Sequence, residues 1–252
     1  MAAIADIRRA EPGASDGAID HLRAKLAPAP PRGAASKSIR VENVVKDYHT
    51  TIGRKRVLDG ISFEVRMGEK IGVLGRNGAG KSTLVRLLAG VEPPTSGRIV
   101  RGLYMSWPLG FAGALPALMT GMDNIRFVAR LYDRPVDDMT AFVDDFAELG
   151  RQLLIPLKEY SSGMMMRLAF ALTLAIDFDC YLIDEILSVG DQRFHRKCHD
   201  ALFVQRKHKA LILVSHDMHT IRRYCDRALV LKSGRGRVFD DLDLALDIYQ
   251  SL

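Results

Sequence analysis

One stretch of the chain combines glycines, a lysine and a serine at a spacing that suits phosphate binding. It reads Gly-Arg-Asn-Gly-Ala-Gly-Lys-Ser over residues 75–82, and Thr83 follows directly. Glycines let the backbone curl so that its N–H groups face phosphate oxygens, while the lysine reaches the β- and γ-phosphates and the serine hydroxyl ligates magnesium. The residues predicted to hold ATP here are Gly75, Arg76, Asn77, Gly78, Ala79, Gly80, Lys81, Ser82 and Thr83, with Ser82 also a ligand of Mg2+.

Two adjacent carboxylates end a short apolar segment farther along the chain. The segment is Cys-Tyr-Leu-Ile at 180–183, and Asp184 and Glu185 follow it. If the segment is a buried strand, both carboxylates lie at the edge of a sheet where open α/β folds bind ligands. Asp184 can then hold magnesium through water, and Glu185 can act as the general base that polarises the attacking water. Such a pair standing alone would more simply cap a turn before a helix.

Ser161 and Gly163 stand at the start of a segment predicted to be a long helix. Serine is a preferred N-cap residue, and the N–H groups of a helix start attract anions. The two residues therefore fit either an ordinary cap or a contact with a γ-phosphate.

These motifs need a scaffold that brings them together. Residues 39–48 and 57–65 alternate between apolar and polar types, which predicts half-buried antiparallel strands. Further strands are predicted at 71–74, near 98–106, and at 180–183, 210–214 and 228–231. Helices are predicted at 82–88, near 122–132 and 136–149, from 163, and at 193–207, 218–225 and after 241. This alternation predicts an α/β fold with a mostly parallel sheet covered on both faces.

Composition narrows the class of protein. The chain has 252 residues, of which 48% are hydrophobic and 26% charged, as expected of a soluble protein with one large α/β domain. It lacks the roughly 18-residue apolar run of a spanning helix and an apolar start typical of a secretion signal, so we expect a cytoplasmic location. Three widely separated cysteines are expected to be free thiols. The net charge is +6, but the lysines and arginines are scattered along the chain, so we expect no nucleic-acid partner.

The chain divides at about residue 38. Residues 1–38 are rich in alanine, proline and small polar types, which predicts a flexible extension. Residues 39–252 are expected to form one ATP-binding domain, with a helical subdomain at about 91–157.

The order of these motifs resembles that of the nucleotide-binding domain of ABC transporters. After the Asp-Glu pair come Ser-Val-Gly-Asp at 188–191 and Val-Ser-His-Asp at 214–217. The resemblance implies a P-loop ATPase with an antiparallel β subdomain and a helical subdomain beside the parallel core. It implies further roles: Ser161 and Gly163 contact ATP held by an opposite subunit, Asp191 communicates across that dimer, His216 senses the γ-phosphate, and Tyr48 stacks on adenine. On local grounds alone, His216 and Tyr48 could equally be structural residues.

Two departures from the family pattern stand out. The family carries a glutamine after the strand near 98–106, but no glutamine occurs between Leu84 and Arg151, and residues 107–111 occupy the place where a substitute contact is expected. The signature reads Ser-Ser-Gly-Met instead of Ser-Gly-Gly-Gln. Residues 106–113, 120–127, 160–164 and 174–181 resemble the ATP-binding proteins of bacterial capsular polysaccharide exporters.

The resemblance implies a function for the chain as a whole. Two copies would sandwich two ATP molecules head to tail, with Lys81, Glu185 and His216 as catalytic residues. The helical subdomain would dock integral membrane permease subunits at the cytoplasmic face of the inner membrane, and the polysaccharide cargo would be engaged indirectly. Alternatives are an O-antigen or teichoic-acid exporter, a soluble ABC ATPase acting on DNA or the ribosome, and a kinase that passes phosphate to an acceptor instead of water.

Overall fold

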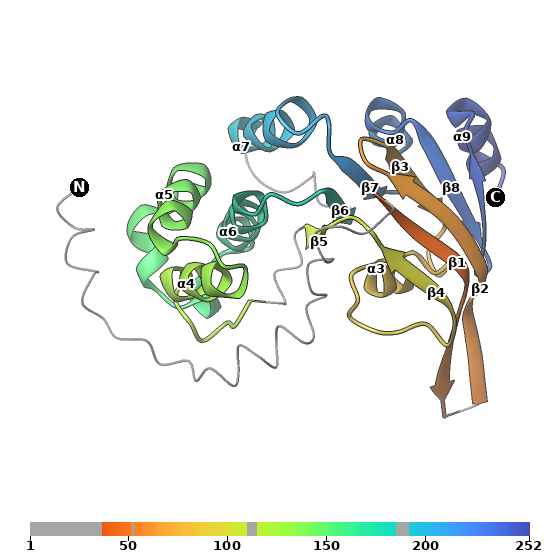
Figure 1. Cartoon of the computed structure of the whole chain (residues 1–252), viewed down its shortest axis with the longest axis horizontal. Helices are drawn as coiled ribbons and strands as arrows, with labels where there is room; N and C mark the ends of the chain where they lie inside the picture. The colour runs from red at the N-terminus through yellow and green to blue at the C-terminus, as the bar shows by residue number, and fades with distance from the viewer. Residues whose placement is uncertain (1–36, 52, 110–114, 185–191) are drawn as a thin grey trace.

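Two β-sheets organise the molecule (Figure 1), whose computed structural model describes residues 37–51, 53–109, 115–184 and 192–252. The strands are β1 (Ser38–Thr50), β2 (Gly53–Arg66), β3 (Lys70–Gly75), β4 (Ser96–Arg101), β5 (Met105–Leu109), β6 (Cys180–Asp184), β7 (Ala210–Val214), β8 (Arg227–Lys232) and β9 (Arg235–Phe239). The smaller sheet has the order β2-β1-β4, and the larger one has the order β5-β6-β7-β3-β8-β9. The smaller sheet is antiparallel, and the larger is parallel except for β9, so the predicted fold class is confirmed.

The helices surround the larger sheet. They are α3 (Lys81–Leu88), α4 (Gly121–Leu131), α5 (Val136–Ala147), α6 (Ser162–Ala175), α7 (Gln192–His199), α8 (Met218–Tyr224) and α9 (Leu242–Gln250), with short 3-10 turns at Gly150–Leu154 and Leu157–Glu159. In Figure 1, α7, α8 and α9 line one side of the larger sheet, and α3 lies on the other side with the smaller sheet. The green helices α4, α5 and α6 form a group at one end.

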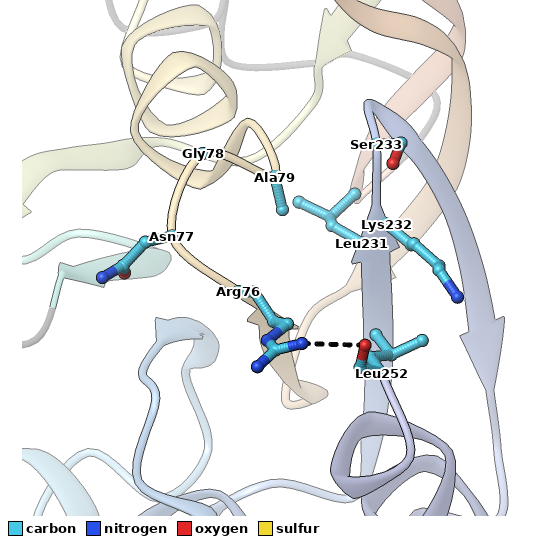
Figure 2. A pocket seen from close by; sticks show the side chains of 8 residues that line it. All are labelled: Arg76, Asn77, Gly78, Ala79, Leu231, Lys232, Ser233 and Leu252. Carbon is cyan, nitrogen blue, oxygen red and sulfur yellow. Dashed lines mark hydrogen bonds between the residues drawn. The ribbon is translucent and has the colours of Figure 1, made fainter.

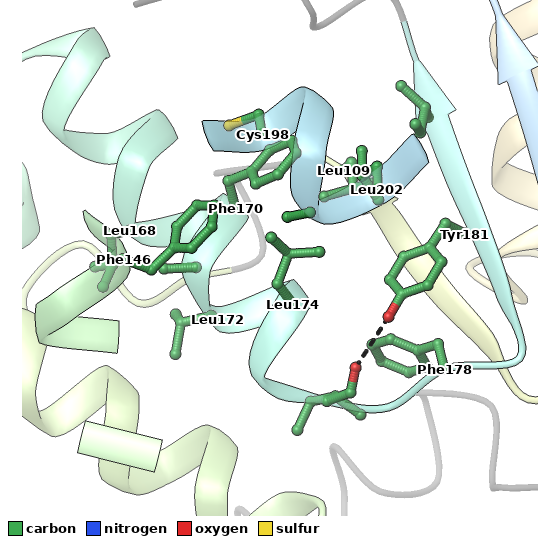
Figure 3. Close-up of a cluster of buried hydrophobic side chains, with 14 of the residues drawn as sticks. Leu109, Phe146, Leu168, Phe170, Leu172, Leu174, Phe178, Tyr181, Cys198 and Leu202 are labelled. Atoms are coloured by element: carbon green, nitrogen blue, oxygen red, sulfur yellow. Dashed lines mark hydrogen bonds between the residues drawn. The ribbon is translucent and has the colours of Figure 1, made fainter. Parts of the chain in front are cut away.

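The larger sheet is buried on both faces. Side chains alternate along a strand, so that Tyr181 of β6 belongs to one hydrophobic cluster and its neighbour Leu182 to another. The first, which we call the helix-side core, contains buried residues of α4 to α9, and Figure 3 shows part of it, including Phe146 and Phe170. The second, which we call the loop-side core, contains buried residues of β1, β2 and α3. Burial on both faces explains why the parallel strands are almost wholly apolar.

The prediction of a single strand near residues 98–106 is wrong. The chain forms β4 in the smaller sheet and β5 in the larger one, because it changes partner between the two. Gly102 N donates to the Ser38 carbonyl at 2.8 Å, whereas the Tyr104 carbonyl accepts from Cys180 N at 3.1 Å. Since β4 and β5 occupy the first part of the expected helical range 91–157, the first helix described there begins only at Gly121.

Other differences are local. The helix predicted at 193–207 ends at His199 and continues as a wider turn at Asp200–Val204. Strand β9 is not predicted, and it follows a tight turn in which Ser233 has φ 49° and Gly234 has φ 80°. Residues 1–36 of the expected extension lie outside the described part of the chain, and Ser38 already belongs to β1.

The three cysteines are buried. Burial raises the pKa of Cys198 and of Cys225 to about 12, so both thiols stay protonated at neutral pH. In the described parts of the chain, no helix combines the length and the apolar character that crossing a membrane requires.

Candidate functional site

The predicted phosphate loop joins the end of β3 to the start of α3. Gly75 is the last residue of β3, and Lys81 is the first of α3. Ala79 N donates to the Arg76 carbonyl at 3.1 Å, and Leu84 N donates to the Gly80 carbonyl at 2.9 Å, so the loop curls tightly into the helix. The first N–H groups of a helix have no partner within it, and they carry the positive end of its dipole. The loop therefore offers several donors for the oxygens of a phosphate.

Gly80 is required by the local packing. Its φ is 109°, and a Cβ placed on it would lie 2.6 Å from Leu58 Cδ2 and 3.1 Å from the Val57 carbonyl oxygen. The start of β2 therefore presses directly against the phosphate loop. Gly78 also has a positive φ of 82°, but a Cβ on it would meet nothing within 4 Å.

These two glycines allow a matched comparison. We expect Gly80→Ala to lower the free energy of unfolding by about 2–3 kcal/mol and to weaken ATP binding, because it adds a clash with β2 to backbone strain. Gly78→Ala adds strain alone and should cost about 1 kcal/mol. Urea unfolding and calorimetric titration with ATP measure both effects. Equal losses of stability in the two variants would show that contact with β2 does not decide the conformation of the loop.

The phosphate loop borders a cleft of about 600 Å³. The residues that line it are Lys55, Arg56, Val57, Asn77, Gly78, Gly80, Lys81, Ser82, Thr83, Asp184, Ser233 and Gly234. The structure thus brings Asp184 into one cleft with most of the predicted phosphate-binding residues. Lys81 Nζ donates to the Gly75 carbonyl at 2.6 Å, so this ammonium lies folded against the start of the loop.

The strand order explains why Asp184 lies at this cleft. Strand β7 lies between β6 and β3, and Val214 of β7 pairs with Asp184 on one side and with Val73 on the other. The strands are parallel, so Asp184 and the phosphate loop leave the sheet at the same edge. The Ser82 hydroxyl and the Asp184 carboxylate are the hard oxygen donors that magnesium prefers.

The place of the missing glutamine lies next to Asp184. Strand β5 ends at Leu109, which pairs with Ile183. The Trp107 ring packs 5.4 Å from the Tyr132 ring and 5.5 Å from the Phe178 ring, between centroids, and does not line the cleft. Residues 110–114 lie outside the described residues, so a substitute contact in that segment stays a prediction.

Two smaller hollows also border the phosphate loop. One of about 230 Å³ has the loop on one wall and the turn after β8 on the other, and Arg76 Nη1 donates to the Leu252 carbonyl at 2.9 Å beside it (Figure 2). Arg76 and Ala79 line this hollow. The other, of about 380 Å³, is lined by His216 and Tyr249 together with Gly75, Arg76 and Asn77. His216 therefore lies next to the phosphate loop, and its role at the γ-phosphate stays a prediction.

Several predicted residues do not line the described part of the cleft. Ser161 caps α6 by accepting a hydrogen bond from Met164 N at 3.2 Å, and Gly163 lies in the first turn of that helix. Neither borders the cleft of its own chain. Tyr48 does not border it either, and its hydroxyl donates to Glu92 Oε1 at 2.6 Å. The predicted Glu185 and Asp191 fall outside the described residues.

The structure adds residues that the motifs did not indicate. Lys55, Arg56 and Val57 of β2 line the cleft together with Ser233 and Gly234, whose turn packs directly against Val57. The guanidinium of Arg56 is held by Asp47 and Asp59, each at 3.0 Å, and its hydrogen bond keeps the pKa of Asp47 below its usual value. The Ser-Gly pair after the apolar run 228–231 was a usable turn signal.

Comparisons with known proteins agree with this geometry. Residues 58–188 match the protein family described as ABC transporter. The chain is 57% identical to the ATP-binding protein BexA of Haemophilus influenzae, over 84% of this chain and 97% of that protein. It is 55% identical to the capsule polysaccharide export ATP-binding protein CtrD of Neisseria meningitidis serogroup B, over 85% of this chain and 99% of that protein. The polysialic acid transport ATP-binding protein KpsT of Escherichia coli is 42% identical over 84% of this chain and 98% of its own.

Solved structures share the fold at lower identity. An ATP-binding subunit of an ABC transporter superposes with a TM-score of 0.72 and 22% identity, covering 83% of this chain and 92% of its own. The dimeric ATP-binding cassette MJ0796, in a post-hydrolysis state with ADP and Pi, superposes with a TM-score of 0.67 and 20% identity, covering 80% and 97%.

Proposed function

Because this chain belongs to the ABC transporter family, we propose that it is the ATP-hydrolysing subunit of an exporter of capsular polysaccharide. One observation carries the proposal: a cleft that joins Lys81, Ser82 and Asp184 occurs in a chain that aligns with 99% of a capsule-export ATP-binding protein. The cleft supplies the chemistry, and the relatives indicate the cargo.

The cleft suits a nucleoside triphosphate with its phosphates on the loop. The N–H groups at the start of α3 would bind phosphate oxygens, and Lys81 would exchange the Gly75 carbonyl for the β- and γ-phosphates. Ser82 and Asp184 would hold magnesium, which neutralises phosphate charge when bound. Glu185, next to Asp184, would take a proton from the attacking water, and His216, which shares a hollow with Asn77 of the loop, would contact the γ-phosphate.

The proposed partner for ATP binding is a second copy of the chain. Ser161 and Gly163 lie at a helix start, where N–H groups attract anions, yet neither borders its own cleft. We therefore place them over the cleft of the other copy, in a head-to-tail pair with two ATP molecules between the subunits. Asp191 would lie near the contact between the two copies.

The proposed membrane partners are integral permease subunits. Residues 39–252 would form the ATP-binding domain, and helices within about 91–157 would meet the permease at the cytoplasmic face of the inner membrane. Closure of the pair on ATP would then drive the permease, and hydrolysis would reset it. The polysaccharide would pass through the permease, so this chain would engage its cargo only indirectly.

Deleting the gene tests the cargo. In an encapsulated strain whose only copy of the gene encodes this chain, we expect the deletion to cause near-complete loss of surface capsule, with polymer accumulating inside the cell. Surface staining and extraction of intracellular polymer measure the two quantities, and the wild-type gene on a plasmid serves as the control. Normal capsule together with loss of another surface glycan would refute the cargo and leave the ATPase standing.

A further inference from the structure

A carboxylate beside the cleft gathers three side chains from two different elements. Glu92 lies in the turn between α3 and β4. It accepts from the Tyr48 hydroxyl at 2.6 Å, from Arg86 Nε at 2.8 Å and from Lys46 Nζ at 2.9 Å. Lys46 and Tyr48 belong to β1, and Arg86 belongs to the last turn of α3. Glu92 therefore ties the antiparallel sheet to the helix that follows the phosphate loop.

Arg86 extends this cluster to the cleft. Its Nη2 donates to the Tyr48 hydroxyl at 3.0 Å and to Thr83 Oγ1 at 3.2 Å. Thr83 lines the cleft, directly after the predicted magnesium ligand Ser82. A continuous path of hydrogen bonds thus runs from Glu92 through Arg86 to a residue of the phosphate site.

The same contacts fix the ring of Tyr48. Its hydroxyl is held by Glu92 and Arg86, and Lys46 Nζ lies 5.1 Å from the ring centroid, over one face. Lys46 is itself held, because it also donates to the Pro93 carbonyl at 2.8 Å. An aromatic ring has two faces, and the opposite face is the one on which a base can stack. The ring is held in place before any nucleotide arrives, which lowers the entropic cost of binding.

The cluster stays charged at physiological pH. Burial opposes ionisation of Glu92, but the hydrogen bonds from Tyr48, Arg86 and Lys46 outweigh it and lower the pKa of this carboxyl to about 2. Glu92 is therefore a carboxylate wherever the protein is folded and active. Its three donors keep their partner across the whole physiological range.

We propose that Glu92 is a positioning residue for nucleotide binding, which holds the Tyr48 ring against the base, both directly and through Arg86. The inference rests on the proposed function, since it takes ATP as the ligand of the cleft and Tyr48 as the residue that meets adenine. Glu92 itself is not among the residues that line the cleft.

Glu92→Gln tests the inference because it keeps the shape of the side chain and removes its charge. We expect the KM and the Kd for ATP to rise about five- to tenfold, with kcat nearly unchanged. The matched control is Glu42→Gln, at another position on β1. It breaks an exposed ion pair with Arg98 of β4 and should leave both constants unchanged.

A base-free probe separates positioning from electrostatics. Inorganic tripolyphosphate has no base to stack on Tyr48, so its Kd should not rise in Glu92→Gln. If Glu92 acted through its charge alone, removing a negative group near the phosphates would tighten the binding of both ATP and tripolyphosphate. Tighter ATP binding, or equal weakening of ATP and tripolyphosphate, would overturn the inference.

Tyr48→Phe completes the experiment, because it removes only the hydroxyl that Glu92 and Arg86 hold. We expect it to weaken ATP binding to a similar degree. The double variant, Glu92→Gln with Tyr48→Phe, should bind ATP no more weakly than either single variant. Additive losses would mean that Glu92 does not act through Tyr48. Tyr48→Phe also carries the test if Glu92→Gln fails to fold, as circular dichroism would reveal. A wild-type protein that binds tripolyphosphate but not ATP would overturn the proposed function and the inference together.

Discussion

Replacing Lys81 with alanine is expected to abolish hydrolysis and to lower kcat/KM for ATP by at least about 100-fold, since it removes the ammonium that we propose meets the β- and γ-phosphates. The loss should exceed that of any other single cation of the cleft. Lys81 is the first residue of α3 and lies where the dipole and the free N–H groups of that helix converge. Steady-state phosphate release and calorimetric titration with ATP measure turnover and binding separately.

A lysine on the strand that leads into the phosphate loop provides the control for this experiment. Lys70 begins β3, at the end opposite to the phosphate loop, and Lys70→Ala should change neither turnover nor binding. If Lys81→Ala hydrolysed ATP at the wild-type rate, the loop would not be the phosphate site. The same assay tests the kinase alternative. An ATPase releases inorganic phosphate from ATP without an added acceptor, whereas a kinase passes the phosphate to an acceptor.

Glu185→Gln is expected to separate binding from chemistry. The amide cannot accept a proton from water, so turnover should fall about 100- to 1,000-fold while the Kd for ATP stays near that of the wild type. If ATP lies between two copies, the variant should also elute as a dimer with ATP and as a monomer without it. Phosphate release and size-exclusion chromatography follow the two effects.

The outcome in cells extends this test. Glu185→Gln as the only copy should leave capsular polymer inside the cell, and expressed beside the wild type it should also reduce export, because mixed pairs would stall. Glu42→Gln makes the same chemical change on the surface of β1 and should do neither. Normal turnover in Glu185→Gln would assign the general base to another residue.

The phosphate loop and Asp184 were predictable because each rests on a local rule. Glycine spacing predicts the loop, and an apolar run that ends in carboxylates predicts a strand end. The two meet without any further information, since parallel strands of one sheet finish at the same edge and only β7 lies between β6 and β3. His216 follows β7 and reaches the loop for the same reason.

What the sequence did not reveal depends on contacts between distant residues. The division into β4 and β5 follows from β4 pairing with β1 and β5 with β6, and no local pattern marks the point where the partner changes. The cleft wall of Lys55, Arg56 and Val57 exists because the turn after β8 packs against β2, about 180 residues away in the chain. The partner of the Tyr48 hydroxyl lies 44 residues downstream and carries no motif of its own.

The two faces of the larger sheet separate the proposed permease contact from the phosphate loop. Helices α4 and α5, where we place the permease contact, pack in the helix-side core, whereas the phosphate loop and α3 pack in the loop-side core. We therefore expect substitutions that adapt the chain to a different permease to fall on the helix-side face and to leave the phosphate loop unchanged.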